Sequence, residues 1–230
     1  MKIMSFNTQH CLNYLEKRVD YEKMAEAIKA CGADIVGLNE MYDEGSSFGR
    51  QTERLGACAE LENHYFAEAC RFSDGSYGNG FLSRYKIESA KTITIPDPVP
   101  RRYDGYYETR CVLKARLENG LVVLVVHFGL NPDEHESAVA TILENLEDEK
   151  CVLMGDFNVT PDNPALRPIR ERLVDTADFF EGEGLSWPSD APEVKIDYIF
   201  VTPDIEVVSA EVPAIIASDH RPHIAEIKFR

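Results

Sequence analysis

The chain has 230 residues, of which 44% are hydrophobic and 10% are aromatic. A sequence of this length and composition can bury a sizeable core, which argues against a disordered chain and predicts a single domain over residues 1–230. The 24 basic and 40 acidic residues leave a net charge of −16. Because Lys and Arg supply most of the affinity for a polyanion, this charge disfavours non-specific nucleic-acid binding, although a local basic patch stays possible.

Cysteine usage and hydropathy bear on the cellular compartment. The six cysteines form no CxxC pair, so we expect reduced, mostly buried thiols, with disulfides as the less favoured alternative. The first residues, MKIMSFN, run directly into a strand pattern without an apolar signal segment. No stretch approaches the roughly 20 apolar residues that a membrane span needs. We therefore expect a cytoplasmic protein without a membrane span, and we expect it to be a monomer.

The first half of the chain begins with alternating strand and helix patterns and then turns strand-rich. Apolar residues at helical spacing predict a helix over 18–30 that Gly32 ends. A second helix is expected over 50–62. Strands are predicted over residues 2–7, 34–40, 65–69, 80–83, 87–95 and 107–117.

The second half contains the most apolar run of the sequence, LVVLVV, within a predicted strand over 121–127 that follows the turn signal Asn119-Gly120. Asn131 and Pro132 open a predicted helix that extends to 146. Further strands are predicted over residues 151–156, 196–201, 205–212 and 223–229. Many strands with helices in two places predict an α/β protein in which two stacked sheets are flanked by helices.

Polar side chains end four of the apolar strands. Asn7, Glu40, His127 and Asp156 are each the last residue of a predicted strand. Layered α/β folds present their chemistry at strand ends, so we expect these four side chains to take part in one site.

Seven short segments carry the predicted site. They are MSFN (4–7), GLNE (37–40), YGNGFLSR (77–84), VHF (126–128), GDFN (155–158), IDYIF (196–200) and SDHRP (218–222). Each is a weak signal alone, but in this order they resemble the endonuclease/exonuclease/phosphatase superfamily, and GDFN and SDHRP are the most specific segments. The resemblance implies a four-layered α/β sandwich of two stacked mixed sheets flanked by helices. It also implies in-line hydrolysis of a phosphoester with a requirement for Mg²⁺, for which Mn²⁺ is a possible substitute.

Oxygen ligands suit Mg²⁺, which keeps several of its waters and is satisfied by one or two carboxylates and an amide oxygen. Asn7 and Glu40 supply such a pair, and Asp219 is a third predicted ligand that acts directly or through water. For Asn7 alone, the alternative is a turn residue at the end of a strand.

The resemblance makes Asp156 the general base that aligns the attacking water. The amide of Asn158 would orient that water or a phosphate oxygen. The alternative is a local turn in which the two residues only cap a loop.

Two histidines are predicted to act on the phosphoryl group. His220 can donate a proton or supply a fixed positive charge, and Asp197 is the natural partner that sets its tautomer. His127 would donate to a non-bridging phosphate oxygen. The alternatives are a solvated histidine at 220 and a satisfied core histidine at 127.

Asn79 and Arg110 are predicted substrate contacts. Glycines on both sides of Asn79 allow the backbone to approach closely, and a plain turn is the alternative. Arg110 is a candidate phosphate clamp, or else an inward-facing arginine paired with Glu108. Gln9 and His10 are further candidates for lining the pocket.

The substrate class is less determined than the reaction. Compact loops and the charge of −16 favour a small or lipid-derived phosphoester. The alternative is a nuclease acting on DNA or RNA, similar to apurinic endonucleases or deadenylases. A catalytically dead binding module is the remote alternative, disfavoured because Glu40, Asp156 and His220 are all present.

Overall fold

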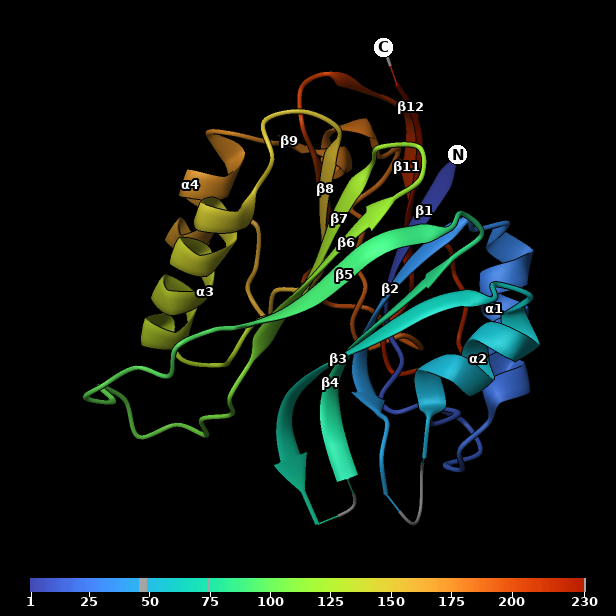
Figure 1. Cartoon of the computed structure of the whole chain (residues 1–230), viewed down its shortest axis with the longest axis horizontal. Helices are drawn as coiled ribbons and strands as arrows, with labels where there is room; N and C mark the ends of the chain where they lie inside the picture. The colour runs from blue at the N-terminus through green and yellow to red at the C-terminus, as the bar shows by residue number, and fades with distance from the viewer. Residues whose placement is uncertain (46–48, 74, 230) are drawn as a thin grey trace.

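Two six-stranded sheets form the centre of the protein (Figure 1). The computed structural model describes residues 1–45, 49–73 and 75–229. The first sheet has the order β11 (Ile205–Glu211), β12 (His223–Phe229), β1 (Lys2–Asn7), β2 (Ile35–Tyr42), β4 (Gly75–Ser83) and β3 (Asn63–Phe72). The second has the order β5 (Ile87–Thr94), β6 (Cys111–Leu117), β7 (Val122–His127), β8 (Cys151–Asp156), β10 (Asp197–Val201) and β9 (Val174–Asp175).

Each sheet contains a parallel pair near its centre. β1 pairs with β2, and β7 pairs with β8. In the second pair, His127 lies directly opposite Asp156 in register, and in the first Asn7 lies opposite Asn39. The parallel pairs therefore carry three residues of the predicted site, Asn7, His127 and Asp156, at their ends, together with Asn39.

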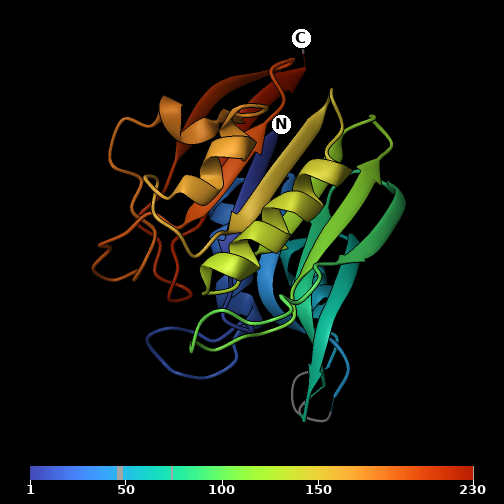
Figure 2. The same ribbon diagram turned by 90° about the vertical axis from the view of Figure 1, so that its left-hand side faces the viewer.

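Helices cover the outer faces of both sheets. α1 (Tyr21–Cys31) and α2 (Gln51–Ala59) lie on one side, and α3 (Pro132–Asn145) and α4 (Arg167–Arg170) lie on the other (Figure 1). Figure 2 looks onto this second layer, where α3 lies across the second sheet. α1 ends at Gly32, whose φ of 65° is left-handed, as the sequence predicts. The predicted four-layered α/β sandwich is confirmed.

The core between the sheets depends on a close approach at Gly37 of β2. A Cβ atom at this position would lie 2.6 Å from Met154 Sδ and 2.9 Å from Val125 Cγ2, both in the opposite sheet. Met154 and Val125 are fully buried. A side chain at position 37 would therefore push the sheets apart.

The predicted end of β2 is wrong. β2 does not stop at Glu40 but continues to Tyr42, with a register shift between Leu38 and Met41 in its pairing with β4. Glu40 has a φ of 60° at this irregularity. It is therefore a bulge residue, and the bulge re-aims its side chain toward the end of the sheet.

Other differences lie at strand ends and in the loops. β3 and β4 extend beyond the strands predicted over residues 65–69 and 80–83. The strand predicted from residue 107 begins only at Cys111, so residues 95–110 form a long connection. Four short elements went unpredicted because they are too short to show periodicity. They are η1 (Pro164–Leu166), α4, β9 and η2 (Thr176–Phe179).

Two expectations from the composition can be compared with the structure. All six cysteines are free, and four of them are buried. Within the described residues, no helix has the length and apolar character needed to cross a membrane.

Replacing Gly37 by Ala should destabilise the fold by about 1–3 kcal/mol, because the added methyl group overpacks the space between the sheets. Urea unfolding of the two proteins would measure the difference. Gly182→Ala is the matched control, since nothing lies within 4 Å of a Cβ at that position. Equal unfolding midpoints for wild type and Gly37→Ala would contradict this account of the packing.

Candidate active site

Polar side chains from both sheets meet where the parallel pairs end. Asn7 of β1 donates through Nδ2 to Asp156 Oδ2 of β8 at 3.0 Å, which links the first sheet to the second. The same Nδ2 donates to Glu40 Oε1 at 3.0 Å. Asn7 and Asp156 are each 1% exposed. The predicted strand-end residues therefore come together in space.

Asp156 uses its two carboxylate oxygens differently. Oδ1 accepts the backbone N–H of Asn158 at 2.9 Å, which is the local turn considered as an alternative role. Oδ2 accepts from Asn7 and faces His127 Nε2 at 3.5 Å and His220 Nε2 at 3.7 Å. Burial raises the pKa of the Asp156 carboxyl, and the charge of His220 only partly offsets that effect. One carboxylate thus both closes a turn and faces the two histidines.

His220 is paired with Asp197. Its Nδ1 lies 2.8 Å from Asp197 Oδ2, and both residues are almost fully buried. Burial alone would lower the pKa of His220, but the carboxylates of Asp197 and Asp156 outweigh it and raise the pKa to about 10. His220 is therefore an imidazolium at neutral pH in the metal-free protein. Lys195, which sequence reasoning missed, supports Asp197 by donating to its backbone carbonyl at 3.1 Å.

His127 has a cation beside its Nδ1, where His220 has a carboxylate. Its Nδ1 lies 2.9 Å from Arg110 Nη1, and Arg110 is paired with Glu108 at 2.6 Å. Burial, with the charges of Arg110 and His220, holds the pKa of His127 well below its ordinary value. The site therefore contains one neutral and one cationic imidazole.

Glu40 and Asp219 are the two carboxylates predicted to bind a metal, and they lie close enough to affect each other electrostatically. Burial raises the pKa of Glu40, Asn7 lowers it, and the charge of Asp219 raises it further. The two carboxylates repel each other, and a cation bound between them would relieve that repulsion. Their oxygens are the kind of ligand that Mg²⁺ prefers. Asn7 fits less directly, because its nitrogen faces Glu40 while its oxygen accepts Gln9 N–H at 3.0 Å. Ligation through that oxygen would require the amide to turn over.

A second group of possible ligands lies close by. It consists of one potential ligand atom from each of three residues, Asp156, Asp197 and His220, and these atoms lie within 4.8 Å of one another. His220 Nδ1 already faces Asp197. Mg²⁺ prefers oxygen ligands to an imidazole nitrogen. The oxygen ligands at Glu40 and Asp219 are therefore the better fit for Mg²⁺.

A profile of the Endonuclease/Exonuclease/phosphatase family matches residues 4–220. This match spans nearly the whole chain and all the side chains described above. The chain belongs to this family. Members of the family are generally hydrolases that act on phosphoester bonds. No curated protein sequence matches the chain.

Solved structures show the same fold. An endonuclease/exonuclease/phosphatase from Bacteroides vulgatus superposes with a TM-score of 0.77 at 22% identity, covering 100% of this chain and 98% of that one. The corresponding protein from Beutenbergia cavernae gives 0.78 at 20% identity, covering 100% and 71%. A mannosyl-6-phosphatase from Bacteroides thetaiotaomicron gives 0.77 at 17% identity, covering 100% of both chains. At these identities the likeness shows a shared fold alone.

In this endonuclease/exonuclease/phosphatase protein, sequence reasoning missed Asn39. Its Oδ1 accepts the Asp156 N–H at 2.9 Å, and its Nδ2 donates to Val126 O at 2.9 Å and to Asn79 Oδ1 at 2.8 Å. Asn39 is fully buried. It therefore fixes the backbone of the second sheet at Asp156 and directly before His127. An amide within the apolar segment IVGLNEMY was the available signal.

The two predicted substrate contacts lie further from solvent than expected. Asn79 is 2% exposed and is engaged by Asn39 and by Cys111 O, to which it donates at 3.0 Å. That placement favours a supporting role for Asn79 over direct contact with phosphate. Arg110 forms the ion pair with Glu108 that was its alternative role. The structure thus places both residues behind the groups that face Asp156.

Left-handed backbone occurs on several segments around the site. Gln9, His10, Cys11, Glu40 and Asn158 have φ values between 45° and 60°. The His10 N–H donates to Glu40 O at 2.8 Å, which holds the 8–11 loop against the bulge. Such conformations cost energy in residues other than glycine and are common at functional sites.

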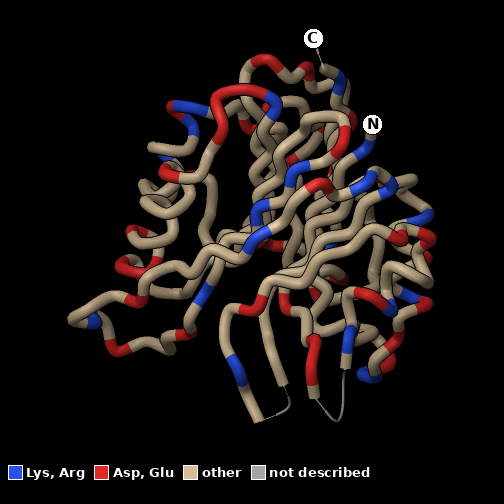
Figure 3. The backbone as a smooth tube through the Cα atoms, in the orientation of Figure 1, with Lys and Arg blue, Asp and Glu red and all other residues tan. Residues whose placement is uncertain are grey.

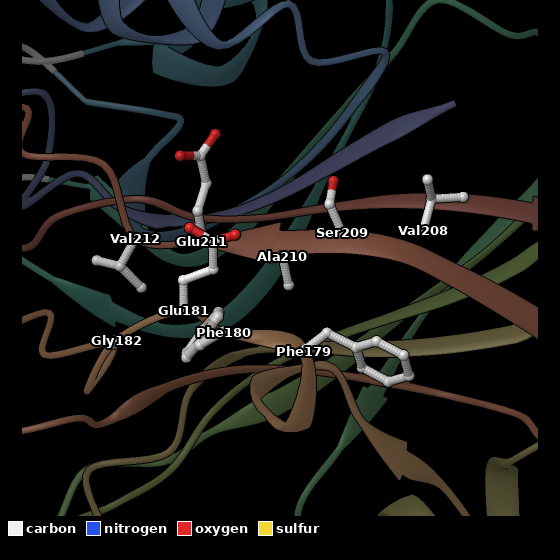
Figure 4. A pocket seen from close by; sticks show the side chains of 10 residues that line it. Phe179, Phe180, Glu181, Gly182, Val208, Ser209, Ala210, Glu211 and Val212 are labelled. Carbon is white, nitrogen blue, oxygen red and sulfur yellow. The ribbon is translucent and has the colours of Figure 1, made fainter.

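A surface hollow lies elsewhere on the protein. It has a volume of about 500 Å³ and lies between β11 and residues 179–184 (Figure 4). Phe179, Phe180 and Glu211 are among its lining residues, and none of the predicted site residues lines it. It carries no functional assignment.

Replacing Asn39 by Asp should lower the free energy of unfolding by on the order of 3 kcal/mol. The change places an acceptor against the Val126 carbonyl and Asn79 Oδ1, both of which lose their donor. Thermal and urea unfolding would measure the loss. Asn119→Asp is the control, because Asn119 accepts the Leu121 N–H through its side-chain oxygen, and an aspartate keeps that acceptor. A variant at position 39 as stable as that control would refute the role given to Asn39.

In EDTA-treated protein, His220 should titrate near pH 10 and remain cationic at neutral pH. Because folding raises its pKa above 6.5, His220 contributes stability below pH 6.5 that is lost as the pH rises through about 10. Proton NMR of the ring would show the midpoint.

Asp197→Asn should lower that midpoint, because the carboxylate charge beside Nδ1 is gone. His127 is the internal control and should show no transition above pH 6.5. A wild-type midpoint for His220 near 6.5 would contradict the proposed ion pair.

Proposed function

We propose that the protein is a Mg²⁺-dependent phosphoester hydrolase, with Mn²⁺ as a possible substitute. The observation that carries this proposal is the charge balance of the site. Among the described residues, the four carboxylates of Glu40, Asp156, Asp197 and Asp219 outnumber the one cation that they surround, His220, since Arg110 is paired with Glu108. A phosphate dianion would be repelled from this group unless a metal cation accompanied it.

The side chains support distinct roles in the reaction. Glu40 and Asp219, with Asn7 beside them, would hold Mg²⁺, which supplies charge neutralisation for the phosphoryl oxygens. Asp156 would act as the general base, and its raised pKa matches a group that accepts a proton near neutral pH. Asn158 would help to orient the attacking water.

In the reaction, the water oxygen forms a bond to phosphorus and its proton passes to Asp156. The bond to the leaving oxygen breaks in line with that attack. His127 and His220 lie 3.5 and 3.7 Å from Asp156 Oδ2, longer than a hydrogen bond, which leaves both Nε2–H groups available to phosphoryl oxygens. The cationic His220 would also protonate or stabilise the leaving oxygen.

The substrate that we propose is a small or lipid-derived phosphoester. The net charge of −16 supports it, because a polyanion is repelled by such a protein. Acidic residues are spread over helices and loops in every layer (Figure 3). A structure with the same fold is that of a mannosyl-6-phosphatase, which supports the proposal of a small phosphoester. A nuclease remains an outcome of the test below.

Hydrolysis of bis-p-nitrophenyl phosphate should require Mg²⁺ or Mn²⁺ and stop in EDTA. Asp156→Asn and His220→Gln should each lower kcat by at least about 10²-fold, because each removes a proton-transfer or electrostatic group. A panel at fixed Mg²⁺ would contain a sugar phosphate, inositol phosphates, sphingomyelin, abasic duplex DNA, single-stranded DNA and poly(A).

Asp148→Asn and His64→Gln are the controls, since both side chains are exposed, and each should retain wild-type kcat. Turnover that is unchanged by EDTA would overturn the metal requirement. Preferential cleavage of the nucleic acids in the panel, with steep loss of binding as salt is raised, would overturn the substrate class.

A further inference from the structure

The partner of His127 Nδ1 determines where the ring carries its proton. Arg110 Nη1 lies 2.9 Å from this nitrogen. A guanidinium has five N–H donors and no acceptor, and it stays protonated in proteins. Nδ1 must therefore accept the hydrogen bond, and the single proton of the neutral ring must lie on Nε2.

The same argument places a proton on Nδ1 of the second histidine, His220. Asp197 presents an acceptor to His220 Nδ1 at 2.8 Å, so that nitrogen carries a proton. Both rings direct Nε2 at Asp156 Oδ2. The site thus offers two Nε2–H donors, one from a neutral ring with an arginine behind it and one from a cationic ring with a carboxylate behind it.

Arg110 is held in place from behind. It pairs with Glu108 Oε1 at 2.6 Å, and the two side chains are 10% and 11% exposed. Glu108 Oε2 accepts the hydroxyl of Tyr106 at 3.2 Å, and its backbone N–H donates to Glu134 Oε1 at 3.4 Å. Because the charge of Arg110 is taken up by Glu108, Arg110 is poorly suited to act as a bare phosphate clamp.

We propose that Arg110 is a positioning residue that holds His127 in the Nε2–H tautomer, so that His127 donates a hydrogen bond to a phosphoryl oxygen. The role of that hydrogen bond in hydrolysis rests on the proposed function, whereas the tautomer does not. In the reverse tautomer, Nε2 would present a lone pair to the Asp156 carboxylate and to the substrate. Both contacts would then be repulsive, and one donor to the transition state would be lost.

Long-range ¹H–¹⁵N correlation spectra of ¹⁵N-histidine-labelled, EDTA-treated protein distinguish the two tautomers. The wild type should show His127 as the Nε2–H form. Arg110→Met removes the donor, so the Nδ1–H form should become populated. Arg110→Lys keeps a group that only donates and should restore the wild-type form. Arg172→Met, which removes an exposed arginine, is the matched control and should change nothing.

Activity gives a second readout. Arg110→Met should lower kcat by at least about tenfold with little change in KM, and Arg110→Lys should recover part of the loss, since the missing donor acts in the transition state. A rise in KM with unchanged kcat would show that Arg110 contacts phosphate directly, and would overturn the positioning role.

The tautomer measurement stays decisive when no phosphoester is hydrolysed, so failure of the proposed function and failure of this inference are separable. An Nδ1–H ring in the wild type overturns the inference without any variant, which covers the case in which Arg110→Met does not fold. An unchanged Nε2–H form in a folded Arg110→Met protein, judged by circular dichroism, also overturns it.

Discussion

One buried amide ties the two sheets together where the chemistry lies. Asn39 belongs to the first sheet, yet its hydrogen bonds end on Val126 and Asp156 of the second. A buried amide that loses its partners is costly, so any other stacking of the sheets would be penalised at this point. The absence of a side chain at Gly37, two residues earlier, lets the sheets approach closely enough for Asn39 to reach across. Packing and polar pairing therefore fix the same register, and the positions of the residues of the candidate active site follow from it.

The electrostatics of the site follow from that register. Asp156 is buried, and burial raises the pKa of its carboxyl. Two imidazoles face its Oδ2. Their charges differ because one has an arginine and the other a carboxylate on Nδ1. A second cationic imidazole would favour a permanent ion pair with Asp156 and weaken it as a base. The neutral His127 leaves that carboxylate basic while still providing an N–H group.

The sequence predicts the strands because their apolar runs are long. The polar residues that end these runs are evident in the sequence itself. Asn7, His127 and Asp156 do end β1, β7 and β8. Glu40 could not be placed so well, since Met41 and Tyr42 continue the apolar pattern and nothing local marks a bulge. Pairing His220 with Asp197 was accessible because both segments have a family pattern, whereas Asn39 was hidden beside the more conspicuous Glu40.

The sequence does not predict which partners the site side chains find, or the course of the loops. Asn79 and Arg110 were placed at the site, but Asn79 is engaged by Asn39 of the neighbouring strand β2, and Arg110, which directly precedes β6, by His127 at the end of the neighbouring strand β7. The connection over residues 95–110 has no period that would reveal its path, yet it contains the ion pair between Glu108 and Arg110 behind His127, and its Tyr106 donates to Glu108. Tyr106 is 60% exposed. An exposed part of this loop is therefore connected to His127 through two half-buried side chains, Glu108 and Arg110.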